Sequence, residues 1–451
     1  MKLKETFFYI IFVFYQVAIA NAQEINDVTT PLHLMQPDYP HAYGAPEIND
    51  IEQVLSRIYT YLDQVTPAQL VDKISEEAIT DFSVIDQNSI MKQGDFRLNS
   101  YEWGVTYAGM LLAAEQTGDE KYTDYATGRL TFLAKALYAF VQLEKQSPDA
   151  SYSLKRSLHP HALDDCGAIC AAMIKAEKAG KAESLDWIIE NYIDYISNKE
   201  FRLEDGTLAR NRPQPNSIWL DDLFMSVPAL AQMGSYSGET KYFDDAVNQV
   251  LQFSKRMFNY DKGLYMHGWV QAMNEHPQFH WARANGWAVM TMVELLEVLP
   301  QDYAGRDQVL DLLRRHIRGL ANYQDGTGFW HQLIDRNDTY LETSATAIYT
   351  YSIARAINRG YVDAKVYGPM VCLAWHAVAS QVNEKGQVEG TCVGTGMGFD
   401  PAFYYYRPIN VFAAHGYGPV LLAGAEMIEL VRIHDICIND SAAILYNTQN
   451  P

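Results

Sequence analysis

Breaks between predicted helices recur about every sixty residues along most of this chain, and no other feature constrains the fold as strongly. The breaks fall at Gly118, Gly180, Gly238, Pro300 and Gly360, in steps of 62, 58, 62 and 60 residues. Between them, apolar residues recur at i, i+3 and i+4, the period of an amphipathic helix. Each unit is long enough for two helices of roughly 12–20 residues and their loops.

The repeat predicts a ring of helical hairpins. The chain has room for about six units, so inner helices can close on one another with outer helices around them. An open solenoid is the alternative, but its usual repeats of about 33–47 residues are shorter. Strand-like alternation is scarce. We therefore expect an all-α domain over residues 51–435, followed by a C-terminal tail over residues 436–451.

A second repeat of about the same period places polar and aromatic residues at the start of each predicted inner helix. In a ring these side chains would meet at one mouth, and concave sites with converging polar groups are the usual ligand sites of proteins. The motifs recur in steps of 61, 57, 62 and 60 residues and are Trp103-Gly104, Leu163-Asp164-Asp165, Leu220-Asp221-Asp222, Trp281-Ala282-Arg283 and Leu341-Glu342-Thr343.

The charge balance excludes several kinds of partner. The chain has 35 Lys and Arg against 55 Asp and Glu, a formal net charge of −20. Nucleic acids and anionic membranes need a basic field, which this composition does not provide. Aromatic residues make up 12% of the chain. That content is typical of a well-packed core or of an aromatic-lined cleft for an uncharged or sugar-like ligand.

The N-terminus is typical of a secretory signal peptide. Residues 1–22 open with Lys2 and Lys4, continue with an apolar run and end with Ala20-Asn21-Ala22, an A-x-A cleavage site. A membrane anchor is the alternative, although about 20 apolar residues are usually needed to span a bilayer. Residues 23–50 contain several prolines and predict an extended arm. We therefore expect an exported, soluble protein, either periplasmic or secreted.

The two Asp-Asp pairs are the strongest candidates for catalysis. Asp164 and Asp221 come first in each pair and should lie on the same side of their helices. Apolar residues surround Asp221, and such surroundings raise a carboxyl pKa, as a general acid at neutral pH requires. For Asp165 and Asp222 we expect helix capping or exposure to solvent. Capping, worth about 1 kcal/mol, is also the alternative for Asp164 and Asp221.

Farther along the chain, Arg283 lies in the sequence between Trp281 and Trp287. Arg283 could bind a carboxylate through two hydrogen bonds, and Trp281 and Trp287 could stack on a sugar ring. The alternative is a core helix in which Arg283 pairs with an internal acid. His267 is expected either to donate a hydrogen bond in the pocket or to be a satisfied structural histidine.

Motifs for metals and cofactors are not found. His159-Pro160-His161 and the acids after it fit no standard zinc spacing. The glycine-rich run from Gly394 to Gly398 lacks the preceding strand of a dinucleotide site and predicts a loop. The chain has only five cysteines, which is few for its length and an odd number, so a disulfide scaffold is not expected. We expect buried thiols instead. We expect neither a metal nor a cofactor.

Ordered motifs over Tyr101–Glu429 identify a family resemblance. They are Thr117-Gly118-Asp119-Glu120-Lys121-Tyr122, Leu163-Asp164, Trp219-Leu220-Asp221, Gly263-Leu264-Tyr265-Met266-His267, Trp281-Ala282-Arg283 through Trp287, Gly328-Phe329-Trp330-His331-Gln332, Tyr340-Leu341-Glu342-Thr343-Ser344-Ala345 and Gly418-Pro419-Val420-Leu421-Leu422-Ala423. Together, in this order, they resemble the unsaturated glycuronyl hydrolases of glycoside hydrolase family 105. The chain departs from that family at Gly268-Trp269-Val270, where Ala-Trp-Asp is common, at His331, where Tyr is common, and in its doubled aspartates.

The resemblance implies an (α/α)6 barrel and a hydrolase. The substrate would be the 4,5-unsaturated uronic acid that polysaccharide lyases leave at the non-reducing end of an oligosaccharide. An aspartic acid would protonate C4 of the double bond, and water would add at C5. By motif, Asp221 would be that acid/base, and Asp164 would help to hold the sugar hydroxyls. The residues expected to line the substrate site are Tyr101, Trp103, Trp219, His267, Trp281, Arg283 and Trp287.

Two other functions stay open from the residues alone. One is a conventional glycosidase or an epimerase on a similar barrel. The other is an exported oligosaccharide-binding protein that keeps an aromatic pocket without catalysis. The presence of both Asp221 and Asp164 favours an enzyme. Its disaccharide-sized substrate could come from rhamnogalacturonan, ulvan or a glycosaminoglycan.

Overall fold

The computed structural model describes residues 25–436, apart from residues 30, 31, 33, 34, 36, 37, 40, 41, 43, 181, 183 and 184. The predicted signal peptide, residues 1–22, lies outside the described residues, as do Cys437 and the rest of the predicted tail. Helix α2 (Ile48–Val65) includes the last three residues of the predicted extended arm. No helix in the described part of the chain is long and apolar enough to cross a membrane.

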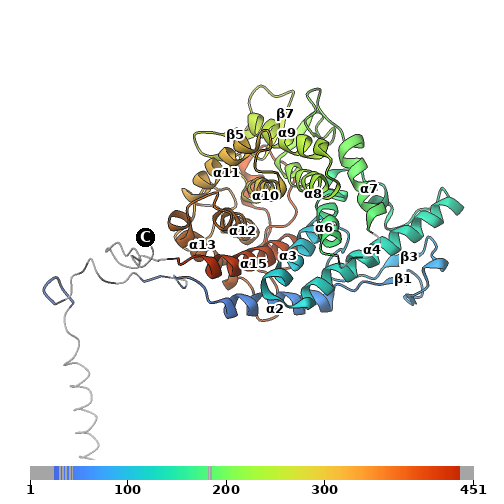
Figure 1. Ribbon diagram of the computed structural model, residues 1–451, viewed down its shortest axis with the longest axis horizontal. Helices are drawn as coiled ribbons and strands as arrows, with labels where there is room; N and C mark the ends of the chain where they lie inside the picture. Colours follow the sequence, from blue (N-terminus) through green and yellow to red (C-terminus); the bar gives the residue numbers. More distant parts are fainter. Residues whose placement is uncertain are drawn as a thin grey trace, which may run out of the picture.

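In the described part of the chain, six inner helices form a closed ring (Figure 1). Each inner helix packs against the next, and α15 packs against α3, which closes the ring. The inner helices are α3 (Tyr101–Thr117), α6 (Gly167–Lys178), α8 (Val227–Ser237), α10 (Ala282–Val298), α12 (Thr343–Asn358) and α15 (Tyr417–Ile433). This ring confirms the predicted all-α barrel and is incompatible with an open solenoid.

An outer helix packs on each inner helix. The outer helices are α4 (Glu120–Gln146) on α3, α7 (Asp186–Asp194) on α6, α9 (Thr240–Met257) on α8, α11 (Arg306–Ala321) on α10, α13 (Ala364–Ser380) on α12 and α2 on α15. Helix α2 comes first in the chain but completes the outer ring beside the last inner helix. The hydrophobic core lies between the two rings.

Tight turns join inner to outer helices at one end of the barrel, here called the hairpin end. Helices α3 and α8 end at Gly118 and Gly238, whose φ angles of 73° and 75° glycine adopts without strain. Asp119 then caps α4 by accepting a hydrogen bond from the Lys121 N–H at 3.1 Å. The inner helices therefore run from their N-termini at the opposite end, here called the mouth, to their C-termini at the hairpin end.

Short strands and single helical turns lead into the inner helices at the mouth. Asp164 and Asp221 lie in the turns η3 (Leu163–Asp165) and η5 (Leu220–Leu223), just before α6 and α8 instead of inside them. The other short elements between the helices are α5 (Lys155–Leu158), η4 (Tyr195–Lys199), β4 (Ser217–Trp219), β5 (Phe258–Asn259), β6 (Leu264–Tyr265), β7 (Gly268–Val270), α14 (Pro401–Tyr405) and η6 (Ala414–Gly416).

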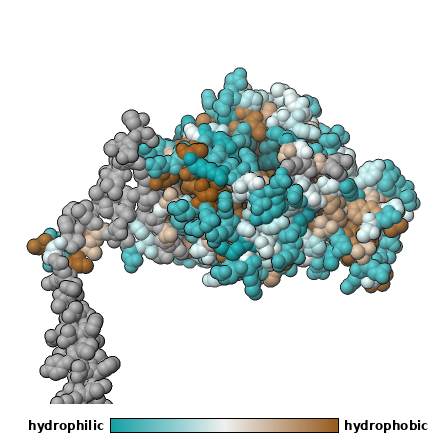
Figure 2. Space-filling view, turned by 60° about the horizontal axis from the view of Figure 1, so that its bottom comes forward, coloured by the Kyte–Doolittle hydropathy of each residue, from teal (hydrophilic) through white to brown (hydrophobic). Residues whose placement is uncertain are grey.

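A small sheet beside α4 was not predicted, because its strands are too short to show alternation in the sequence. Its strands, in sheet order, are β2 (Ala78–Ile79), β1 (Leu70–Asp72) and β3 (Ser89–Met91), and η2 (Phe82–Val84) packs on α4. Helix α4 has 27 residues and projects with this sheet beyond the barrel (Figure 1). Figure 2 shows hydrophobic residues on this projecting end, where Ile74 and Val84 are exposed.

Candidate active site

The pairing of two short strands holds Asp221 at the mouth. Strand β4 pairs with β7, with Trp219 opposite Gly268, and the Leu220 N–H donates to the His267 carbonyl at 2.9 Å. The chain then turns through η5, which brings Asp221 beside His267. The His267 Nε2 lies 3.0 Å from Asp221 Oδ2. Two separate sequence motifs therefore meet in one hydrogen bond.

His267 is buried and held on both sides of its ring. Its Nδ1 lies 2.7 Å from the hydroxyl of Tyr404, and its ring packs against Trp281 with centroids 4.7 Å apart. The side chain is only 1% exposed. His267 is therefore a satisfied, buried histidine, and one of its two hydrogen bonds goes to the candidate catalytic carboxyl.

Arg210 joins the two aspartate pairs, and the sequence analysis did not single it out. Its Nη2 donates to Asp164 Oδ2 at 2.9 Å, and its Nε and Nη2 donate to the two oxygens of Asp222 at 2.8 and 2.5 Å. Its guanidinium lies over the ring of Trp219, 4.1 Å from the centroid. Arg210 comes from an irregular segment before β4, so no helical period marks it in the sequence.

The second aspartate of each pair has a different environment from its counterpart. Asp222 is buried and ion-paired to Arg210, so it has neither the capping nor the solvent-facing role that we predicted. Asp165 caps neither η3 nor α6. Its Oδ2 instead accepts the N–H of His161, four residues earlier in the chain, at 2.9 Å. It also lies 3.8 Å from Arg156.

Burial raises the pKa of one acid in each aspartate pair. It raises the pKa of Asp164, with Arg210 acting in the opposite direction and the charge of Asp221 adding to the rise. Burial also raises the pKa of Asp222, again against the influence of Arg210. The charge of Asp221 acts on both Asp164 and Asp222, so these three carboxyls are close enough to interact.

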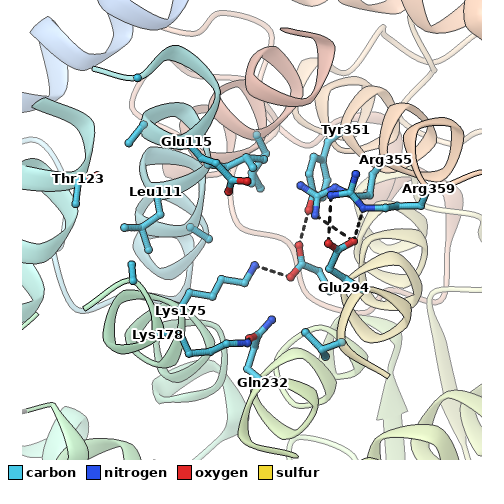
Figure 3. Close-up of a pocket in the computed structure, with 18 of the residues that line it drawn as sticks. Leu111, Glu115, Thr123, Lys175, Lys178, Gln232, Glu294, Tyr351, Arg355 and Arg359 are labelled. Carbon is cyan, nitrogen blue, oxygen red and sulfur yellow. Dashed lines mark hydrogen bonds and ion pairs between the residues drawn. The ribbon is translucent and has the colours of Figure 1, made fainter. Parts of the chain in front are cut away.

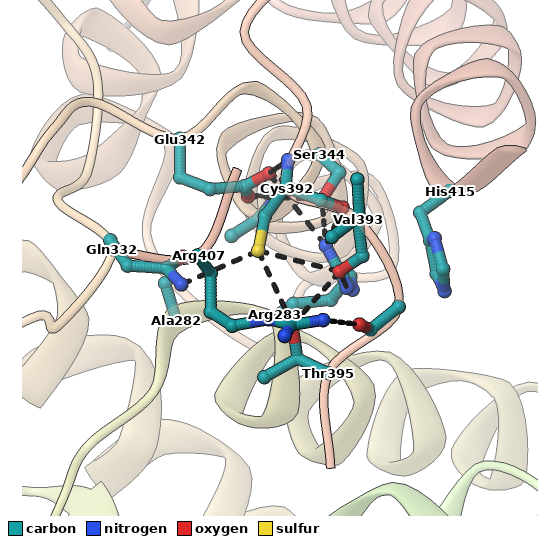
Figure 4. A network of polar contacts seen from close by, with 12 residues as sticks. Ala282, Arg283, Gln332, Glu342, Ser344, Cys392, Val393, Thr395, Arg407 and His415 are labelled. Carbon is teal, nitrogen blue, oxygen red and sulfur yellow. Dashed lines mark hydrogen bonds and ion pairs between the residues drawn. The ribbon is translucent and has the colours of Figure 1, made fainter. Parts of the chain in front are cut away.

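Arg283 is buried under a loop of the mouth (Figure 4). Its Nη1 and Nη2 donate to the carbonyls of Cys392 and Val393, both at 2.7 Å, and its Nη1 lies 3.8 Å from Glu342 Oε1. The guanidinium is therefore largely occupied by protein groups. This geometry favours the alternative in which Arg283 pairs with an internal acid over direct binding of a substrate carboxylate.

The loop that Arg283 supports covers part of the mouth. We call residues 392–406 the strap. An added Cβ at Gly268 would collide with the side chain of Met397, and one at Gly396 would lie 3.2 Å from the ring of Trp219. Gly268 therefore leaves room for the Met397 side chain of the strap against strand β7.

Tyr101 also lies at the mouth, beside His415. Its hydroxyl is 2.6 Å from His415 Nε2. Burial raises the pKa of Tyr101, and the nearby charges of Asp164, Arg283 and Asp221 also act on it. Among the predicted site residues, Tyr101 therefore shares the mouth with the two aspartates.

The predicted tryptophans divide into two groups. Trp219 is half-buried at the mouth, and Trp281 packs beneath His267. Trp103 and Trp287 instead lie in the core, which corrects our prediction that they line the substrate site. Trp103 stacks on Phe96 with centroids 4.8 Å apart, and its Nε1 donates to the Tyr125 hydroxyl of the outer helix α4. Trp287 stacks on Phe224, with centroids 5.0 Å apart.

Two cavities open at the mouth. One, of about 360 Å³, is lined by Asp164, Arg210 and Asp222 among others. The other, of about 420 Å³, reaches His415 and Val393. Among the described residues, no group of three or more His, Cys, Asp or Glu side chains could hold a metal ion. The site thus offers carboxyls, an imidazole and aromatic rings, which suit acid–base chemistry on a sugar.

Comparison with known proteins identifies a matching family and several curated relatives. Glycosyl Hydrolase Family 88 matches residues 70–431. The unsaturated rhamnogalacturonyl hydrolase YesR of Bacillus subtilis is 27% identical over 373 residues, which cover 80% of this chain and 98% of that protein. An unsaturated 3S-rhamnoglycuronyl hydrolase of Formosa agariphila is 28% identical over 223 residues, which cover 47% of this chain and 58% of that protein.

A solved structure shares the fold. It is a possible member of the GH105 family from Klebsiella pneumoniae, with a TM-score of 0.67 at 24% identity, covering 90% of this chain and 99% of that one. The family match extends over most of the chain and confirms the resemblance that the motifs indicated. The chain belongs to Glycosyl Hydrolase Family 88, among the unsaturated glycuronyl hydrolases, and is a glycoside hydrolase.

Proposed function

We propose that this protein removes 4,5-unsaturated uronic acid from the non-reducing end of lyase-generated oligosaccharides, with Asp221 as the acid/base. One observation carries the assignment of Asp221. Its Oδ2 is held by His267, while its Oδ1 has no hydrogen-bond partner in the described part of the chain. One oxygen of an otherwise anchored carboxyl is thus available to a bound sugar.

The chemistry that the family implies needs only this carboxyl and water. Asp221 gives its proton to C4 of the C4=C5 double bond, and a water oxygen adds to C5 while the water gives a proton back to the carboxylate. The hemiketal formed at C5 opens to a ketone, which leaves a hemiacetal at C1. Collapse of the hemiacetal to an aldehyde expels the rest of the saccharide as an alcohol. No carboxylate attacks C1, so the usual spacing rule for two carboxylates does not apply.

The neighbours of Asp221 supply binding and orientation in this proposal. Asp164, partly exposed and fixed by Arg210, would hold the sugar hydroxyls. Trp219 would stack on the sugar ring from its half-buried position. Arg283 would contribute to the site through its positive charge, which interacts with both Tyr101 and Asp221.

We propose that rhamnose follows the unsaturated uronic acid in the substrate. The support is that the names of the two curated relatives above describe rhamnogalacturonyl and 3S-rhamnoglycuronyl hydrolases. The test is a panel of unsaturated disaccharides from rhamnogalacturonan, ulvan and a glycosaminoglycan. Loss of the ultraviolet absorbance of the conjugated double bond reports hydration, and we expect the rhamnose-containing disaccharides to react fastest.

The same panel separates the alternatives. A binding protein without catalysis would bind the disaccharides and leave their absorbance unchanged. A conventional glycosidase would also cleave matched saturated disaccharides, which have no double bond to protonate. Absence of any absorbance loss across the panel would contradict the hydrolase proposal.

We also propose that the protein is exported. The support is the charged start, apolar run and A-x-A site of residues 1–22, which lie outside the described residues. Cell fractionation of the full chain, beside a chain that lacks residues 2–22, tests this. We expect the full chain outside the cytoplasm with its mature N-terminus at Gln23, and the truncated chain in the cytoplasm.

A further inference from the structure

Tyr404 of the strap ends a chain of hydrogen bonds that begins at Asp221. Its hydroxyl lies 2.7 Å from His267 Nδ1, and His267 Nε2 lies 3.0 Å from Asp221 Oδ2. On the other side the hydroxyl accepts the Gly398 N–H at 3.0 Å and lies 3.2 Å from the Gly398 carbonyl. Tyr404 is fully buried, so water cannot replace these partners.

The phenol has only one proton, and two acceptors compete for it. In a neutral imidazole, if the proton goes to the Gly398 carbonyl, Nδ1 of His267 must be the protonated nitrogen and Nε2 presents a lone pair to Asp221. The contact with Asp221 then requires the acid proton to sit on Oδ2, where it points at His267 and away from the open mouth.

The other arrangement places the acid proton where it can react. If Tyr404 donates to Nδ1, His267 carries its proton on Nε2 and donates it to Asp221 Oδ2. Oδ2 is then an acceptor only, and the acid proton of Asp221 must sit on Oδ1. Oδ1 is the oxygen that has no protein partner in the described part of the chain.

We infer that Tyr404 is a positioning residue that donates to His267 and so keeps the acid proton of Asp221 on Oδ1. Two distances support this direction. The contact of Tyr404 with Nδ1, at 2.7 Å, is shorter than its contact with the Gly398 carbonyl, at 3.2 Å. The Gly398 N–H already fills one acceptor position of the hydroxyl. The inference rests on the proposed function for the role of Asp221.

Other groups act on Asp221 but not on Nδ1 of His267. Within the described residues, the charged and titratable side chains whose fields reach Asp221 come from α3, η3, η5, α10 and the segment before β4. They are Tyr101, Asp164, Arg210, Asp222 and Arg283. None of them hydrogen-bonds to Nδ1, which leaves Tyr404 to select the protonated nitrogen.

The first test needs no substrate. Nitrogen-15 NMR of the histidine-labelled mature protein near neutral pH reports which ring nitrogen is protonated, with His267 assigned by comparison with His267→Gln. We expect Nε2 to be protonated and Nδ1 not in the wild type, and a mixture of both tautomers in Tyr404→Phe. A wild-type proton on Nδ1, or on both nitrogens, would overturn the inference.

The second test uses turnover. Tyr404→Phe removes the hydroxyl and keeps the ring that packs on Phe279, with centroids 5.2 Å apart. We expect kcat to fall at least about tenfold while KM stays within about twofold, because general acid catalysis is lost and binding is kept. Tyr405→Phe is the matched control, because that hydroxyl bonds to Asp338 near the surface at 2.9 Å. We expect it to match the wild type.

The two tests fail in different ways. A Tyr404→Phe variant with wild-type kcat overturns the inference. If the wild type turns over no unsaturated disaccharide, the proposed function fails, and the NMR result still decides the tautomer. If Tyr404→Phe does not fold, the wild-type spectrum decides alone.

Discussion

The two ends of the barrel both bury ion pairs, but they arrange them differently. At the mouth, Asp164 and Asp221 precede the N-termini of α6 and α8. At the hairpin end, Lys175 and Arg355 lie in the last turns of α6 and α12. Helix dipoles favour anions at N-termini and cations at C-termini, by about 0.3–1 kcal/mol each. The parallel inner helices therefore favour carboxyls at one end and cations at the other.

The two ends differ in how the oxygens of their buried carboxyls are paired. The hairpin end holds a cavity of about 610 Å³, larger than either cavity described at the mouth (Figure 3). There Lys175 bonds to Glu294 at 2.5 Å, Tyr351 bonds to the same carboxyl, and Arg355 pairs with Glu426 at 2.6 Å. At the mouth, Oδ1 of Asp221 has no such partner within the described residues. Glu115 also lines this cavity without a hydrogen bond among the described residues, but it is exposed and no other group holds it. What distinguishes the mouth, where we propose that the reaction occurs, is a carboxyl that is held through one oxygen and keeps the other without a partner.

The largest expected effect is on turnover at the mouth. Asp221→Asn keeps the size of the side chain and removes the proton that the reaction needs. We expect kcat to fall about a thousandfold on the preferred disaccharide, because general acid–base groups contribute roughly 10²–10⁴-fold. The loss of double-bond absorbance measures it. Asp165→Asn, in the other aspartate pair, is the control and should stay within about threefold of the wild type.

Full turnover by Asp221→Asn would show that another group is the acid/base and that the free oxygen is incidental. In that case Asp164 is the next carboxyl to substitute, because it is close enough to Asp221 for the charge of Asp221 to act on it.

Paired substitutions of two arginines compare the ends directly. Arg210→Gln leaves Asp222 buried without its cation, and Arg355→Gln does the same to Glu426. Breaking a buried pair on one side costs about 3–5 kcal/mol, so both variants should lose comparable free energy of unfolding. Only Arg210→Gln should also lower kcat in the folded fraction. Denaturant unfolding and turnover on the same samples measure both quantities.

A loss of kcat in folded Arg355→Gln would contradict this separation. It would mean that the hairpin end is coupled to the mouth along the inner helices.

The sequence predicted the ring and the aspartates because both follow a period. Breaks at glycine or proline recur where inner helices end, and Asp164 and Asp221 recur where they begin. Arg210 and Tyr404 follow no period, since they belong to irregular segments that reach the mouth only through tertiary packing. Trp103 shows a second limit. It lies two residues after Tyr101, about 200° around the helix, so Tyr101 faces the mouth while Trp103 faces the core.

A smaller effect is expected on the stability of the mouth at mildly acidic pH. Burial lowers the pKa of His316 to about 3. The Nε2 of His316 donates to Oδ1 of Asn285, in the first turn of α10, at 3.1 Å. The same oxygen also accepts the N–H of Tyr265. Because the unfolded chain binds a proton near pH 6.5 and the folded one does not, stability falls as pH drops below that value.

The expected loss between about pH 6.5 and pH 5 is about 2 kcal/mol of unfolding free energy. At the hairpin end, Lys175 and Arg355 outweigh burial and lower the pKa of Glu294, so its contribution is lost only at more acidic pH. His316→Gln should flatten the slope in this window, and His161→Gln, at an exposed site, should not. An unchanged slope in His316→Gln would assign the acid sensitivity to other groups.

The smallest expected effect is that of salt on substrate capture. The chain carries a formal charge of −20, and the cations nearest the catalytic carboxyl are already occupied: Arg210 by two carboxylates and Arg283 by backbone carbonyls. An anionic substrate therefore gains no long-range attraction, and recognition acts at contact distance. We expect kcat/KM to change less than about threefold between low and physiological ionic strength, with no decrease as salt is added. A steep fall with salt would mean that exposed cations at the mouth, such as Arg212, steer the substrate in, and Arg212→Gln would then abolish the dependence.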